Sequence, residues 1–208
     1  MPHVRKVLLF SLVFFLLVPV IAFLVFHFSS PTDAGLETIK LQNGDLILRR
    51  GRSIESFAVF MADKNRDFSH IGIVAIENGE PFVIHAVPGE SGKNPERVIK
   101  ERPEIFLSRE KASHYAIYRS IFSAWEREKV AAKALEYYYN GVEFDHEYNL
   151  DSDQKVYCTE LVFKAYQQLS IDIHQFELKD IHIFSGTRKI LFPGSFITAP
   201  QFFPLFSN

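Results

Sequence analysis

The chain has 208 residues, of which 47% are hydrophobic and 23% are charged, and its formal net charge is −2. This composition is typical of a folded protein and excludes a disordered or low-complexity chain. The slight acidic excess offers no general attraction for phosphate backbones, so nucleic acid is not an expected partner. The single cysteine excludes an intramolecular disulfide.

The N-terminus contains an uncharged apolar run, Val7–Phe26, preceded by Arg5 and Lys6. As a helix at ~1.5 Å per residue, this run is just long enough to cross the hydrocarbon core of a bilayer. The apolar part of a cleaved signal peptide is usually only about 7–15 residues long, so we favour an uncleaved anchor over cleavage. We therefore expect residues 1–30 to form a membrane anchor or signal segment.

The two basic residues before the apolar run should stay in the cytoplasm, which places the following domain across the membrane. In a bacterium this predicts an inner-membrane anchor with the domain in the periplasm, or a secreted domain if the segment is cleaved. Residues 31–38 contain Pro31 and Gly35 and are expected to form a tether. The folded domain is expected over residues 39–208.

The first part of the domain has the pattern of strands. A buried strand is predicted within Gly44–Gly51, with Asp45 in a structural role at its entry, and a helix over Ser53–Ala62. The apolar segments Ser69–Ile76 and Pro81–Ala86 flank the turn signal Glu-Asn-Gly-Glu and predict a β-hairpin.

Two histidines lie in this predicted hairpin. Because side chains alternate along a strand, His70 and His85 should lie toward one end of the hairpin and could be neighbours. Gly72 would leave open space beside His70, and a glycine in a strand often marks the close approach of another group.

The rest of the domain mixes strands and helices. Strands are predicted over Arg97–Lys100 and His114–Arg119, and a capping box at Ser123 opens a helix that ends at Asn140-Gly141. Residues 141–155 are expected to form a loop. Residues 171–208 contain three prolines and are expected to form a strand with irregular packing. We find no internal repeat and no metal motif, and we expect no cofactor.

Cys158 lies where a helical period begins, so we expect it in the first turn of a helix. The N-terminus of a helix lowers the pKa of a thiol, and its backbone N–H groups can bind the oxyanion formed on an attacked carbonyl. A histidine must take the thiol proton, and a third group must hold that histidine in the useful tautomer. A lone buried cysteine can also be inert packing, and spacing alone leaves His114 as a rival base to His70.

The segments Gly44-Asp45-Leu46-Ile47, Ser69–Val74, Val83–Ala86 and Tyr157–Val162, in this order, resemble a known family. They are similar to the YiiX/YaeF-like permuted papain-like amidases of the NlpC-type cysteine peptidase superfamily, which is related to lecithin retinol acyltransferase. The resemblance covers roughly residues 40 to 200. It implies an α+β fold, circularly permuted papain-like, with an antiparallel sheet and packed helices after the N-terminal transmembrane helix.

The resemblance implies Cys158 as nucleophile, His70 as base and His85 at the orienting position. Many relatives of the YiiX type carry an acidic residue there, whereas the acyltransferase branch has histidine. A neutral His85 stabilises the imidazolium less than a carboxylate would.

The first hypothesis is a membrane-tethered, extracytoplasmic cysteine hydrolase that cleaves amide bonds, plausibly in peptidoglycan peptides. The second is a lipid acyl hydrolase or acyltransferase with the same chemistry, which His85 and the aromatic segment Phe196–Phe206 favour slightly. The third is a non-catalytic binding module. The expected partners are thus a peptide or lipid-acyl substrate and the bacterial inner membrane.

Overall fold

The computed structural model describes residues 36, 38–53, 56, 59, 62–63, 67–89, 96–152, 154–170, 175–183 and 186–207. The chain divides into two units, residues 1–38 and Ile39–Asn208. The expected membrane segment Val7–Phe26 lies outside the described residues, as does most of the helix expected over Ser53–Ala62. No described helix has the length and hydropathy that crossing a bilayer requires.

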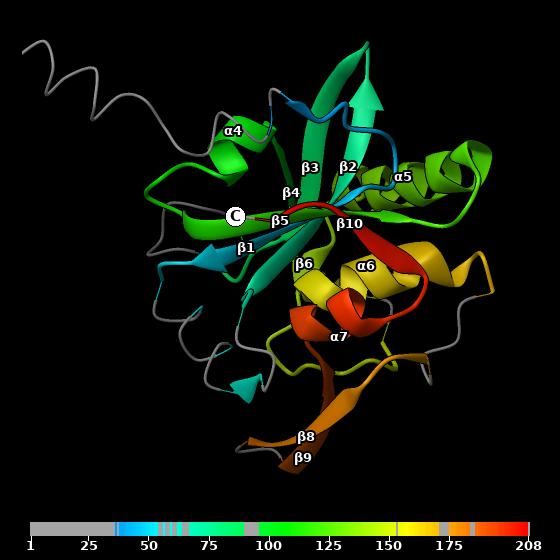
Figure 1. Cartoon of the computed structure of the whole chain (residues 1–208). Helices are drawn as coiled ribbons and strands as arrows, with labels where there is room; N and C mark the ends of the chain where they lie inside the picture. Colours follow the sequence, from blue (N-terminus) through cyan, green and yellow to red (C-terminus); the bar gives the residue numbers. More distant parts are fainter. Residues whose placement is uncertain are drawn as a thin grey trace, which may run out of the picture. The chain divides into compact units, whose positions relative to one another are not determined.

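The second unit is an α+β domain, and its elements carry the labels of Figure 1. In chain order they are β1 (Leu46–Gly51), β2 (His70–Glu77), β3 (Glu80–Ala86), β4 (Val98–Glu101), α4 (Pro103–Phe106), β5 (Ala112–Ser120), α5 (Ala124–Tyr139), β6 (Glu143–Phe144), β7 (Lys155–Val156), α6 (Cys158–Gln167), β8 (Leu178–Ile183), β9 (Gly186–Leu191), α7 (Pro193–Thr198) and β10 (Phe202–Ser207).

The main sheet has six strands in the order β10-β5-β1-β2-β3-β4, and every neighbouring pair is antiparallel. Helices α5 and α6 pack against each other and against β2 and β3. Apolar side chains from these helices and from the inner strands form one hydrophobic core. The antiparallel sheet with packed helices confirms the expected α+β architecture.

The predicted hairpin is confirmed as β2 and β3, joined by the two-residue turn Asn78-Gly79. Both turn residues have positive φ, 53° and 82°, which is the conformation of a type I′ turn and matches the twist of the strands. The short turn fixes the register from Glu77 opposite Glu80 to Ile73 opposite Ile84.

Asp45 has the structural role expected at the entry of β1. Its fully buried carboxylate accepts hydrogen bonds from the backbone N–H of Gln42 at 2.8 Å and from Nε and Nη2 of Arg119, both at 2.7 Å. Because Arg119 is on β5, this bidentate pair ties the start of β1 to the neighbouring strand.

Several elements differ from what the sequence predicted. Residues 141–155 contain β6, which pairs in parallel with β7, rather than a plain loop. The C-terminal region is more regular than expected, with the β8–β9 hairpin, α7 and β10. Strand β10 pairs with β5 at the edge of the main sheet, where Pro204 is tolerated because edge strands leave one row of N–H groups unpaired. The short helix α4 was not predicted.

Gly72 lies in β2 against β3, and the space beside it is filled rather than open. A Cβ on Gly72 would lie 2.5 Å from Val83 Cγ1, 3.1 Å from the Ile84 carbonyl oxygen and 3.2 Å from His85 Cβ. The absence of a side chain therefore lets β3, and His85 with it, approach β2 closely.

We predict that Gly72→Ala lowers the free energy of unfolding by about 1–3 kcal/mol, because the added methyl group overpacks a buried contact. The double variant Gly72→Ala/Val83→Ala should be less unstable than the two single changes added together, since removing the Val83 methyl groups makes room. Urea denaturation of the four proteins measures both effects. Strictly additive losses would contradict the packing described here.

Candidate active site

Cys158 is the first residue of α6, as expected. The helix begins there because the buried Glu160 carboxylate accepts the backbone N–H of Tyr157 at 3.1 Å, which caps an otherwise unpaired group. The thiol is half-buried, and the backbone N–H groups of Ile71, Thr159 and Cys158 itself oppose the effect of burial on its pKa. Helix α6 packs against β2, which brings the start of the helix near the strand that carries His70.

His70 and His85 are neighbours, which confirms the expectation from the hairpin. His70 Nε2 lies 2.8 Å from His85 Nδ1, and the ring planes are nearly perpendicular at 82°. Both side chains are buried, with 8% and 1% of their surfaces exposed. A hydrogen bond between two buried rings requires that one nitrogen donates and the other accepts, so the tautomers are restricted.

Glu101, at the end of β4, continues this chain of hydrogen bonds. Its Oε1 lies 3.1 Å from His85 Nε2, and its Oε2 accepts a hydrogen bond from Lys111 Nζ at 2.7 Å. Sequence reasoning missed Glu101 because the predicted strand ended at Lys100. Alternation could have found it, since Ile99 pairs with His85 and Glu101, two residues further on, lies on the same face of the sheet.

The ionisation of Glu101 determines which nitrogens of the two histidines carry hydrogens. Burial alone would raise the pKa of this carboxyl, but the hydrogen bonds from His85 and Lys111 and the nearby positive charge lower it to about 2. An ionised carboxylate only accepts, so His85 Nε2 carries a hydrogen and donates it. In neutral His85 the Nδ1 atom then accepts from His70 Nε2–H. This assignment leaves His70 Nδ1 as the nitrogen that can accept a proton.

Both histidines are neutral at rest. Burial lowers the pKa of His85 to about 4, although its hydrogen bond to Glu101 opposes this effect. The pKa of His70 lies well below its usual value, first because of burial and then because of the nearby positive charges, of which that of Arg49 has the largest effect. A neutral imidazole is the form that can act as a general base.

The thiol is also neutral at rest. Burial raises the pKa of Cys158 to about 11, against the opposing effect of the three backbone N–H groups and the Arg49 guanidinium. The sulfur therefore has to lose its proton as it reacts, rather than wait as a thiolate. This requirement makes a correctly oriented base necessary.

Phe106, from α4, forms one wall of the site. Its ring centroid lies 5.6 Å from that of His70 and 4.9 Å from that of His85. Phe106 also contacts Arg49. The Arg49 Cζ atom lies 4.3 Å from the Phe106 ring centroid, and Arg49 Nη1 donates a hydrogen bond to the Phe106 carbonyl oxygen at 2.7 Å. Helix α4, which the sequence did not predict, thus helps to bury both imidazole rings and to hold their orientation.

His114 is not part of this group. His114 lies on β5, opposite Arg50 of β1 and two strands away from β2 in the sheet, and its exposed ring lies 3.1 Å from the Ser113 carbonyl oxygen. This position favours His70 over His114 as the candidate base. His146 and His182 also lie elsewhere, next to Glu96 and Thr187 respectively.

We predict that Glu101→Gln slows alkylation of Cys158 at pH 7 by about tenfold, because removing the charge leaves the His70 imidazolium less stabilised. Lys111→Gln is the matched control, since it keeps the carboxylate beside His85 and should not slow the reaction. Nitrogen-15 NMR of the imidazole rings should find hydrogens on Nε2 of both histidines in the unmodified protein. Equal alkylation rates with and without Glu101 would contradict this role.

Comparisons with known proteins show which family and fold the chain resembles. A family model described as permuted papain-like amidase enzyme, YaeF/YiiX, C92 family, matches residues 40–203. The uncharacterized protein YiiX of Escherichia coli (strain K12) is 31% identical over 129 residues, which are 61% of this chain and 57% of YiiX.

A crystal structure described as metalloprotein YiiX from Escherichia coli O157:H7 has the same fold, with a TM-score of 0.67 and 23% identity over 82% of this chain and 99% of that chain. Within the described ranges, no group of three or more His, Cys, Asp and Glu residues is placed to hold a metal ion. The match over residues 40–203 shows that the chain belongs to the permuted papain-like amidases of the YaeF/YiiX type, a family of cysteine amidases and peptidases.

Proposed function

We propose that the domain cleaves amide bonds through a covalent acyl-enzyme on Cys158, with His70 as general base and His85 and Glu101 as positioning residues. The observation that carries this proposal is the hydrogen-bond chain from Glu101 through His85 to His70. It restricts the tautomer of a neutral imidazole on β2, the strand against which the helix that begins at Cys158 packs.

In the acylation step, His70 Nδ1 takes the thiol proton as the sulfur attacks the carbonyl carbon. The oxyanion forms at the N-terminus of α6, where the backbone N–H groups of the first turn have no carbonyl partner within the helix. The C–N bond then breaks and the proton on His70 passes to the leaving amine. Water, deprotonated by the same nitrogen, hydrolyses the thioester and restores the thiol.

Glu101 compensates for the presence of a neutral histidine, rather than a carboxylate, at the orienting position. His85 itself is neutral, but it donates to an ionised carboxylate, so negative charge is available one hydrogen bond further from His70. The pair supplies the orientation and the charge that an acidic residue would supply alone.

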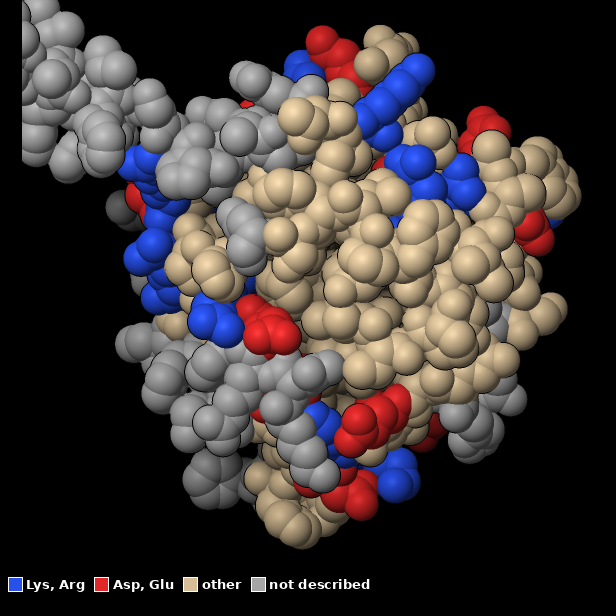
Figure 2. Space-filling model, in the orientation of Figure 1, with Lys and Arg blue, Asp and Glu red and all other residues tan. Residues whose placement is uncertain are grey.

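The favoured substrate class is a peptide amide, plausibly in peptidoglycan. In the aromatic segment that suggested a lipid substrate, Phe196 and Phe202 are buried in the core and are not available to a lipid chain, whereas Phe203 is exposed. On the face drawn in Figure 2, basic and acidic side chains lie together at the margin around an uncharged centre over α7 and β10. Such a distribution does not favour nucleic acid as a partner.

The residues before the domain support a proposed location at the inner membrane. Arg5, Lys6 and the apolar run Val7–Phe26 favour an inner-membrane anchor that holds the domain in the periplasm, beside the cell wall. Cleavage of the segment would instead release the domain.

We predict that Cys158→Ala abolishes release of new amino groups from muropeptides, with a loss of at least about a thousandfold, because no other thiol can form the acyl-enzyme. Phospholipids are incubated in parallel. Release of fatty acid without release of amine would favour the lipid alternative. Full activity in Cys158→Ala, or a Cys158 that resists selective alkylation, would favour a binding module.

We expect the full-length protein to stay in the membrane fraction after extraction with sodium carbonate and to be released by detergent, because a spanning helix is held by its apolar surface. N-terminal sequencing of the same sample tests cleavage. An intact chain that is extracted by carbonate would contradict the anchor.

A further inference from the structure

A pocket of about 980 Å³ lies between the loop that leads to α6, the helix itself and the β8–β9 hairpin. We call it the hairpin pocket. Its lining includes Tyr148, Asn149, Phe163, Gln167, Leu178 and Arg188. The sequence predicted a loop over residues 141–155 and irregular packing over residues 171–208, which supply most of this lining, and it indicated no functional role for them.

Tyr148 connects the hairpin pocket to the nucleophile. Its ring packs edge-on against Tyr157, the residue before Cys158, with ring centroids 5.2 Å apart. Burial raises the pKa of the Tyr148 phenol, and negative charge on Cys158 raises it further, so the two groups are within electrostatic reach. Tyr148 has a φ of 52°, a conformation that non-glycine residues seldom adopt. One lining residue of the pocket, Tyr148, is thus in contact with the residue that precedes Cys158.

Arg188, on β9, is the unusual residue of this pocket. Its side chain is half-buried, its Nε atom is buried without a hydrogen-bond acceptor, and within the described part of the chain it forms no ion pair. The adjacent Lys189 differs, because it pairs with Asp180 at 3.1 Å. Partial burial of a guanidinium costs free energy unless an anion pairs with it. We therefore expect Arg188 to pair with an acidic group from outside the chain.

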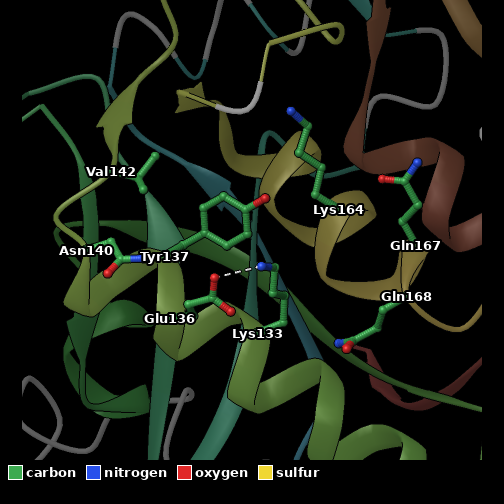
Figure 3. Close-up of a pocket in the computed structure, with 8 residues that line it drawn as sticks. All are labelled: Lys133, Glu136, Tyr137, Asn140, Val142, Lys164, Gln167 and Gln168. Atoms are coloured by element: carbon green, nitrogen blue, oxygen red, sulfur yellow. Dashed lines mark hydrogen bonds and ion pairs between the residues drawn. The ribbon is translucent and has the colours of Figure 1, made fainter.

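A second pocket, of about 470 Å³ between α5 and α6, provides the contrast (Figure 3). It also has cationic side chains in its lining, but both already have carboxylate partners. Lys133 lies 2.8 Å from Glu136, and Lys164 lies 3.0 Å from Glu160. The cations of this second pocket are used within the protein, whereas Arg188 is not.

We propose that the hairpin pocket binds the substrate segment next to the scissile bond, and that this segment is a peptide with a carboxylate that pairs with Arg188. This inference rests on the proposed function and narrows its substrate class. Most side chains of the lining are polar, and Asn149, Gln167 and Thr187 match the donors and acceptors of a peptide backbone. A lipid acyl chain would require a mainly apolar lining. Asp151, which also lines the pocket, suits a donor on the same peptide.

The test measures binding in the full-length Cys158→Ala protein, so it does not depend on cleavage. The probes are two fluorescein-labelled peptides, Ala-Glu-Lys-Ala and the same peptide with Gln in place of Glu, followed by fluorescence anisotropy. The acidic peptide should bind about tenfold more tightly, and Arg188→Gln should remove this preference. Arg97→Gln is the matched control, because Arg97 is exposed and lines neither pocket; it should keep the preference.

Equal binding of the two peptides, including no detectable binding of either, would overturn the inference, and so would a preference that survives Arg188→Gln. Binding of vesicles of phosphatidylglycerol that depends on Arg188, without binding of the acidic peptide, would assign the pocket to a lipid and also overturn it. Thermal unfolding of each variant shows that it is folded. Failure of the proposed function is a separate result, read from the wild-type protein as loss of Cys158 alkylation and amine release.

Discussion

The active site depends on the register of β2 against β3. A slip of one residue would turn every side chain of one strand to the other face of the sheet and separate His85 from His70. The Asn78-Gly79 turn holds the register at one end of the hairpin, and Gly72 allows close approach near the other. The orienting pair of the site is therefore a product of local hairpin geometry.

Cys158 is positioned by long-range packing. Helix α6, which begins at Cys158, packs against β2, the strand that carries His70. The permuted order of the chain, with the histidine strands before the cysteine helix, makes no difference to this contact, because only the spatial neighbours matter.

Sequence patterns predicted what depends on local chemistry. The turn at Asn78-Gly79, the capping box at Ser123 and the helix start at Cys158 all follow from short-range signals, and each is present. Glu101 and Arg188 were not found, because their importance arises from neighbours far along the chain. Glu101 acts through a strand pairing whose end was placed one residue too early, and the Ser185-Gly186 turn signal between β8 and β9 was not recognised.

The raised pKa of Cys158 also determines how this thiol can be oxidised. Oxidation of a thiol by peroxide proceeds through the thiolate, as alkylation does, so a half-buried sulfur with a pKa of about 11 needs a base to remove its proton in either reaction. Under the proposed mechanism that base is His70. The arrangement that would let the sulfur react with a substrate would then also expose it to peroxide.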